Sequence, residues 1–125
     1  MKNQIIQERS KNIPRISYHF DTNRFELIGR LIPENPELIF KRIDDWIKLH
    51  FENNDALSVF IQLEYINSGS AEYLFRIMKQ LAAYNSNGKK IEITWLYEED
   101  DEAILELGEH YRDFIGAPLK MSMVL

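Results

Sequence analysis

The sequence predicts one α/β domain, of the α+β-like kind, in which a mixed sheet of about five or six strands carries about three helices mainly on one face. Strand-type and helix-type apolar patterns follow one another in the order ββαβαβαβ. Nearly every strand alternates apolar and polar residues, whereas strands covered on both faces read as continuous apolar runs. The helices should therefore leave the other face of the sheet largely exposed to water. A length of 125 residues without a linker or repeat is typical of a single domain, residues 1–125.

The first half of the chain predicts a hairpin followed by a helix. Two alternating runs flank a turn at residues 21–23, and the apolar positions of the runs are Ile16, Tyr18, Phe20, Phe25, Leu27 and Gly29. Pro33 and Pro36 then mark the boundary between the hairpin and the helix, with Asn35 as a candidate helix cap and Pro36 at the first helical position. The apolar face of this helix comprises Ile39, Ile43, Trp46, Ile47 and His50. An extra edge strand is expected around Ile5.

The second half predicts strands and helices in alternation. The longest strand covers residues 57–65, and a helix opens near Ala71 and stops at residues 85–88, with Gly88 as a left-handed cap. A strand at residues 91–97 follows. The acidic run at residues 98–102 then opens the third helix, and the last strand ends the chain.

Composition excludes several classes of function. The net charge of −5 opposes non-specific nucleic-acid binding, which requires basic patches that neutralise phosphates. The absence of cysteine removes disulfides, thiol catalysis and thiolate zinc sites, and it suits a reducing cytosol. No stretch approaches the roughly 18 consecutive apolar residues that span a membrane. We therefore expect a cytoplasmic protein that uses neither nucleic acid nor membrane as a partner.

The segment Asn67-Ser68-Gly69-Ser70 joins the longest strand to the second helix and admits two readings. As an N-cap, Asn or Ser accepts hydrogen bonds from the free backbone N–H groups of the first helical turn. As a phosphorylation site, a serine here would carry a phosphate that the helix N-terminus favours. Serine-nucleophile chemistry is disfavoured because no Gly-x-Ser-x-Gly elbow is present, and no Walker phosphate loop occurs either.

The acidic run Glu98-Glu99-Asp100-Asp101-Glu102 favours a structural explanation. It lacks the alternating spacing and central glycine of a calcium loop, whereas acidic residues in a first helical turn complement the helix dipole. The histidines are too widely spaced for a His-x-x-x-His zinc pair. The sequence thus predicts no metal or cofactor, although a partner-facing acidic patch and an enzyme using Asp100 and Asp101 with a divalent ion stay open as alternatives.

Four segments together resemble the SiaC-type regulatory phosphoproteins of bacteria. These segments are GRLIPEN (29–35), LEYINSGS (63–70), WLYEEDDE (95–102) and LGEHYRD (107–113). The resemblance implies a fold like the STAS domain of anti-sigma-factor antagonists. It also implies a phosphoacceptor at the position of Ser68, where the family has threonine, with Gly69 in place of a family serine. Ser70 is the rival acceptor, and Tyr65, Asn67, Gly69 and Ser70 would shape the loop and contact partners.

The resemblance further implies a non-enzymatic partner switch. A serine/threonine kinase of the histidine-kinase-type ATPase class would phosphorylate the protein, and a PP2C-like phosphatase would reverse the reaction. The unphosphorylated form would activate an effector, a diguanylate cyclase in the family's described case. The alternative from another class is a constitutive protein-binding module that uses the open sheet face or the acidic patch.

Overall fold

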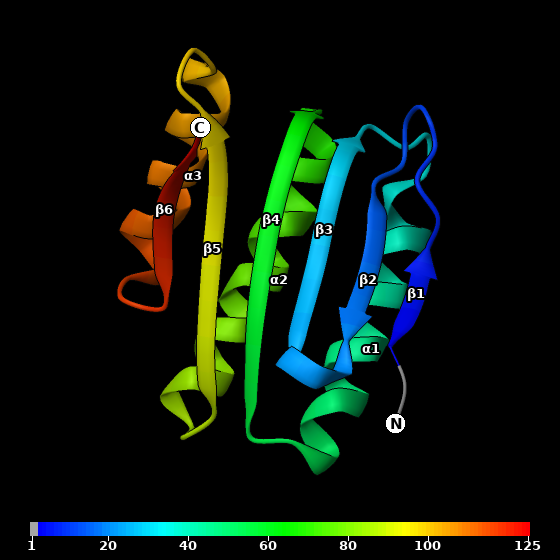
Figure 1. Cartoon of the computed structure of the whole chain (residues 1–125), viewed down its shortest axis with the longest axis vertical. Coiled ribbons are helices and arrows are strands. Elements are labelled where there is room, and N and C mark those ends of the chain that lie inside the picture. Colours follow the sequence, from blue (N-terminus) through cyan, green and yellow to red (C-terminus); the bar gives the residue numbers. More distant parts are fainter. Residues whose placement is uncertain (1–2) are drawn as a thin grey trace.

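A computed structural model describes residues 3–125 and shows a six-stranded sheet backed by three helices (Figure 1). The strands and helices run in the order β1 (Gln4–Gln7), β2 (Arg15–His19), β3 (Arg24–Leu31), α1 (Pro36–Asn53), β4 (Ala56–Ile66), α2 (Ser68–Ser86), β5 (Lys90–Glu98), α3 (Glu102–Ile115) and β6 (Leu119–Val124). Strands β1, β2 and β3 pair antiparallel, and β3 to β6 pair parallel in sequence order. The predicted element order and the extra edge strand around Ile5 are confirmed.

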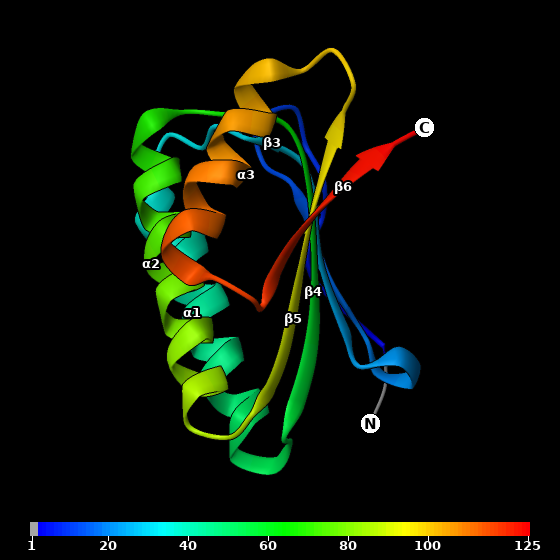
Figure 2. The same cartoon turned by 90° about the vertical axis from the view of Figure 1, so that its left-hand side faces the viewer.

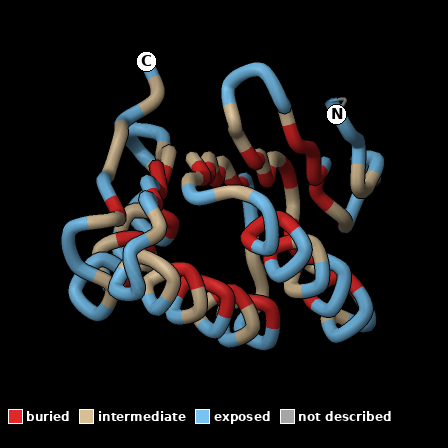
Figure 3. Tube along the Cα trace, turned by 90° about the horizontal axis from the view of Figure 1, so that it is seen from below, coloured by how far each residue is buried: buried red, intermediate tan, exposed pale blue. Residues whose placement is uncertain are grey.

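All three helices cover the same face of the sheet, as the side view shows (Figure 2). The reason is the alternation along the strands: in β3, for instance, Phe25, Leu27 and Leu31 are buried, whereas Arg24, Glu26 and Ile28, which alternate with buried residues, are only half-buried. Because successive side chains of a strand point to opposite faces, one apolar face per strand can bury only one layer of helices. Buried residues accordingly line the surfaces that the sheet and helices turn toward one another (Figure 3).

The open face is less wet than the sequence predicts. Ser17 and Thr94 are only 2% and 5% exposed. The guanidinium of Arg24 lies over the Phe60 ring, with its central carbon 4.1 Å from the ring centroid. Long side chains on this face thus lie along the sheet and shield their neighbours, as arginine stems commonly do.

Several predicted boundaries are wrong by a few residues. Phe20 leaves the strand and begins a short 3₁₀ turn, Phe20–Thr22, after which Asn23 takes a left-handed conformation. Helix α2 begins at Ser68 and not near Ala71, so the predicted loop is largely helical. Helix α3 begins at Glu102, at the end of the acidic run. Asn35 occupies the N-cap position of α1, but its side chain makes no capping hydrogen bond.

The parallel half of the sheet places the β4–α2 and β5–α3 junctions at one edge. Parallel strands end at the same side of a sheet, and each helix here starts directly after its strand. In Figure 1 this edge is at the top, and the C-terminus of α1 lies at the opposite end. None of the helices in residues 3–125 has the length and apolar character needed to cross a membrane.

Candidate functional site

The junction between β4 and α2 is held by backbone and side-chain hydrogen bonds of Asn67. Its Oδ1 accepts the backbone N–H of Ser70 at 2.9 Å, which is the capping bond expected from an asparagine at this position. Its own backbone N–H donates to the carbonyl oxygen of Leu31 at the end of β3, at 3.3 Å. Asn67 therefore both starts the helix and ties the junction to the neighbouring strand.

The two serines of the segment differ sharply in accessibility. Ser68 and Gly69 are exposed in the first turn of α2. Ser70 is 0% exposed, and its hydroxyl oxygen has no hydrogen-bond partner among the described residues. The difference follows from helix geometry, because residues two apart in a helix point about 200° away from each other. An enzyme can reach the Ser68 hydroxyl without disturbing the fold, whereas it can reach Ser70 only by opening the helix start.

Tyr111 anchors the first turn of α2 from below. Its hydroxyl donates to the carbonyl oxygen of Ala71 at 2.5 Å, and its ring packs edge-on against Trp95 with the centroids 5.4 Å apart. Trp95 in turn donates its Nε1–H to the carbonyl oxygen of Ile104 at 2.9 Å. Burial raises the pKa of Tyr111 well above its usual range, so its hydroxyl stays a donor. These contacts join the first turn of α2 to α3.

Sequence reasoning did not assign this anchoring role to Tyr111. In the sequence, Tyr111 lies within LGEHYRD, one of the segments that carry the family resemblance. The available signal was chemical: a buried tyrosine hydroxyl generally needs a hydrogen-bond partner. This rule predicts that the hydroxyl has a hydrogen-bond partner. Only the fold shows that the partner is the carbonyl oxygen of Ala71, 40 residues earlier in the chain.

The surroundings of Ser68 are compatible with an anion. No acidic residue lies in the first turn of α2, and Glu72 in the next turn is paired with Arg76 at 3.3 Å. Arg30, at the end of β3, places its guanidinium carbon 5.8 Å from the centroid of the Tyr65 ring. Tyr65 itself is 54% exposed beside the junction. The helix N-terminus and the Arg30 side chain thus lie at the β4–α2 junction, on an edge that also carries the acidic run of the β5–α3 junction.

The acidic run at the β5–α3 junction has a capping role. Glu98 ends β5, and the Oδ1 of Asp101 accepts the backbone N–H of Ile104 at 3.1 Å as the N-cap of α3. Only Glu102 lies in the first helical turn. Within residues 3–125, no group of three or more histidine, aspartate or glutamate side chains is placed to hold a metal ion. The structural explanation of the run therefore accounts for Asp101 and Glu102.

Comparisons with known proteins agree with this architecture. The model of the SiaC family, described as regulatory phosphoproteins, matches residues 7–124. A protein of Pseudomonas aeruginosa strain UCBPP-PA14, described as uncharacterized, is 24% identical over 110 residues, which make up 87% of each chain.

Solved structures match over nearly the whole chain. SiaC of Pseudomonas aeruginosa has a TM-score of 0.88 at 21% identity, covering 99% of this chain and 100% of that one. A structure described as the diguanylate cyclase SiaD in complex with its activator SiaC, from the same species, matches with a TM-score of 0.84 at 21% identity, covering 93% of this chain and 96% of that one. The predicted fold class is thereby confirmed.

Proposed function

The chain belongs to the SiaC family of regulatory phosphoproteins, and we propose that phosphorylation of Ser68 decides which partner protein it binds. Membership of this family also bears out the expectation of a regulatory protein that is not an enzyme. The observation that carries the proposal is the position of Ser68, an exposed hydroxyl at the first residue of α2 beside the fully buried Ser70.

The fold can hold a phosphate at Ser68 at little cost. A phosphoserine carries about −1.5 to −2 charge at pH 7, and a helix N-terminus favours an anion by roughly 0.3–1 kcal/mol. The Asn67 and Tyr111 hydrogen bonds hold this turn through groups other than the Ser68 side chain. Phosphorylation would therefore change the surface of the junction and leave its backbone in place.

A docked partner would respond much more strongly. Burying an unpaired dianion at an interface costs several kcal/mol, and each 1.4 kcal/mol is about tenfold in affinity. A partner that covers Ser68 and the exposed Tyr65 would thus bind the unphosphorylated form and release the phosphorylated one.

The proposed partners follow from the family and from the solved complex. The effector is a diguanylate cyclase, as in the complex of SiaD with its activator SiaC. A serine/threonine kinase of the histidine-kinase-type ATPase class adds the phosphate, and a PP2C-like phosphatase removes it. We place the protein in the cytoplasm together with these proposed partners.

The first experiment locates the phosphate. The protein is co-expressed with the cognate ATPase-type kinase, and intact mass spectrometry counts the phosphates added. We expect one phosphate on the native chain, one on Ser70→Ala and none on Ser68→Ala. If the phosphate persists in Ser68→Ala and is lost in Ser70→Ala, the acceptor is Ser70 and not Ser68. If no kinase phosphorylates the native chain, the proposed switch is wrong.

The second experiment measures the consequence for binding. Ser68→Asp should weaken binding to the cyclase at least tenfold relative to Ser68→Ala, measured by calorimetry, while its melting temperature stays near that of the native protein. Ser70→Asp is the matched comparison: it buries a carboxylate without a partner and should lower the melting temperature strongly. Equal affinities of Ser68→Asp and Ser68→Ala would instead favour the constitutive binding module.

A further inference from the structure

We propose that the cavity between β1, β2 and the C-terminal half of α1 binds a neutral, planar nitrogen heterocycle of the purine-base or purine-nucleoside class. The cavity measures about 520 Å³ and lies at the end of the sheet opposite Ser68. That volume falls in the roughly 300–1,000 Å³ range of small-molecule sites.

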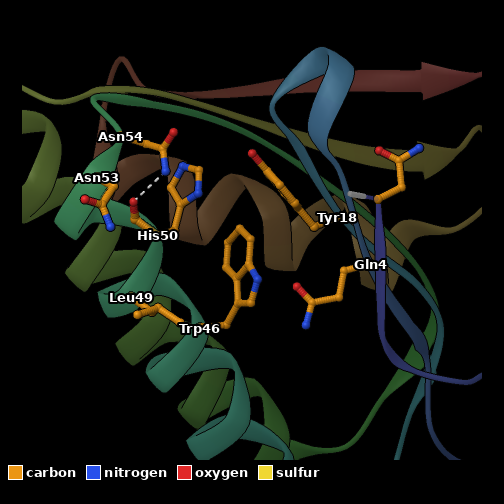
Figure 4. A pocket seen from close by; sticks show the side chains of 8 residues that line it. Gln4, Tyr18, Trp46, Leu49, His50, Asn53 and Asn54 are labelled. Atoms are coloured by element: carbon orange, nitrogen blue, oxygen red, sulfur yellow. Dashed lines mark hydrogen bonds between the residues drawn. The ribbon is translucent and has the colours of Figure 1, made fainter. Parts of the chain in front are cut away.

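Aromatic rings form one side of the cavity. Figure 4 shows Tyr18 of β2 and Trp46 and His50 of α1 extending toward the same opening. The Trp46 ring stacks on His50 with the centroids 4.9 Å apart and an angle of 16° between the planes, and Tyr18 lies 4.8 Å from Trp46. Phe25 also packs on the indole, with the centroids 4.9 Å apart, and Trp46 is half-buried, so part of its ring stays uncovered beside the cavity. Flat aromatic surfaces of this kind bind bases by stacking.

Side-chain amides form the rest of the polar lining. Gln4 and Asn53 line the cavity and are exposed, and Asn54 donates its Nδ2–H to the carbonyl oxygen of His50 at 2.8 Å, which leaves its Oδ1 as an acceptor. An amide offers a donor and an acceptor side by side, which matches the edge of a purine, as Asn and Gln do when they read adenine.

The charge of the lining selects against phosphate. Among the described residues that line the cavity, none is Asp, Glu, Lys or Arg. His50 is 6% exposed, and its Nε2 lies 2.9 Å from the carbonyl oxygen of Ala56, so this nitrogen carries the proton. Burial lowers the pKa of His50, which keeps the ring neutral. Lys89 donates its Nζ–H to the carbonyl oxygen of Asn54 at 3.1 Å, but it is already paired with Asp55 at 2.9 Å. The described lining therefore suits an uncharged base better than a phosphorylated ligand.

The test is a fluorescence titration of the full chain with adenosine. The chain has two tryptophans, and Trp95 is 0% exposed, so a ligand in this cavity should change only the emission of Trp46. We expect a saturable change with adenosine and none with ribose or inorganic phosphate. Trp46→Phe should abolish the signal.

Three alanine variants make the test specific. Gln4→Ala and Asn53→Ala should each weaken adenosine binding roughly threefold to tenfold, the effect of losing one hydrogen bond. Asn12→Ala, an exposed asparagine outside the cavity, should bind as the native chain does. The proposal is overturned if adenosine gives no saturation up to millimolar concentration, if ribose or phosphate binds equally well, or if both cavity variants keep native affinity. Phosphorylation at Ser68 is scored separately, so either result leaves the switch untouched.

Discussion

Gly108 allows α3 to pack closely against the sheet. A Cβ at this position would lie 2.3 Å from Cδ1 of Trp95 and 2.7 Å from Cε of Met121. Trp95 cannot move aside easily, because it is 0% exposed and its indole N–H is bonded to Ile104. We predict that Gly108→Ala lowers the free energy of unfolding by about 1–3 kcal/mol, the usual cost of overpacking a core. Urea denaturation measures this change.

Gly69→Ala is the matched control for that substitution. Gly69 is also helical, in the first turn of α2, but a Cβ there would meet nothing within 4 Å. Glycine is roughly 0.5–1 kcal/mol less favourable than alanine inside a helix, so this variant should be as stable as the native chain or slightly more so. Similar destabilisation by both variants would show that the close contact with Trp95 is not the cause.

At the scale of elements, two of the three helices begin with a side-chain cap and the third does not. Asn67 and Asp101 accept hydrogen bonds from the third residue of their helices, at 2.9 Å and 3.1 Å, whereas Asn35 makes no such bond. We predict that Asn67→Ala and Asp101→Ala each cost about 0.5–2 kcal/mol of stability. Denaturation curves of the single variants, fitted with a common slope, provide the comparison.

Asn35→Ala separates the hydrogen bond from the N-cap position. The residue is the N-cap of α1, and the next residue, Pro36, already has its backbone φ angle restricted to a helical value. Its replacement should therefore change stability by less than about 0.5 kcal/mol, as for an exposed site without special contacts. A loss equal to that of Asn67→Ala would mean that position alone, and not the observed bond, sets the cost.

At the scale of the whole molecule, patterns that repeat along the chain were predictable and single contacts were not. The alternation of β3 and β4 was enough to predict a sheet covered on one face, because burial on one side repeats at every second residue. The start of α2 was misplaced because Asn67, Ser68 and Ser70 are all acceptable caps. That Ser70 is buried depends on packing between segments far apart in sequence, as the Tyr111–Ala71 bond illustrates.

The cavity between β1, β2 and α1 could likewise be predicted only in part. Trp46 and His50 were predicted on the apolar face of their helix, and the structure confirms this: His50 is buried and Trp46 packs half-buried against the core. Gln4 and Asn53 had no pattern to mark them, since isolated amides are common in loops and at helix ends. Only the pairing of β1 with β2 brings Gln4 opposite Tyr18 and beside α1.

The sheet as a whole should open from one edge. Strand β4 pairs with a neighbour on each side along most of its length, whereas β1 is a four-residue edge strand with an irregular register and no fully buried residue. Local opening free energies in proteins range from near zero at such edges to the global value in central strands.

We predict that amide hydrogen exchange, followed by NMR, is slowest in β4 and fastest in β1 among the strands. Strand β6, the other edge, packs on α3 and should lie between them. Amides of β1 that exchange as slowly as those of β4 would show that the sheet opens as a single unit, and that the cavity beside β1 has a rigid wall.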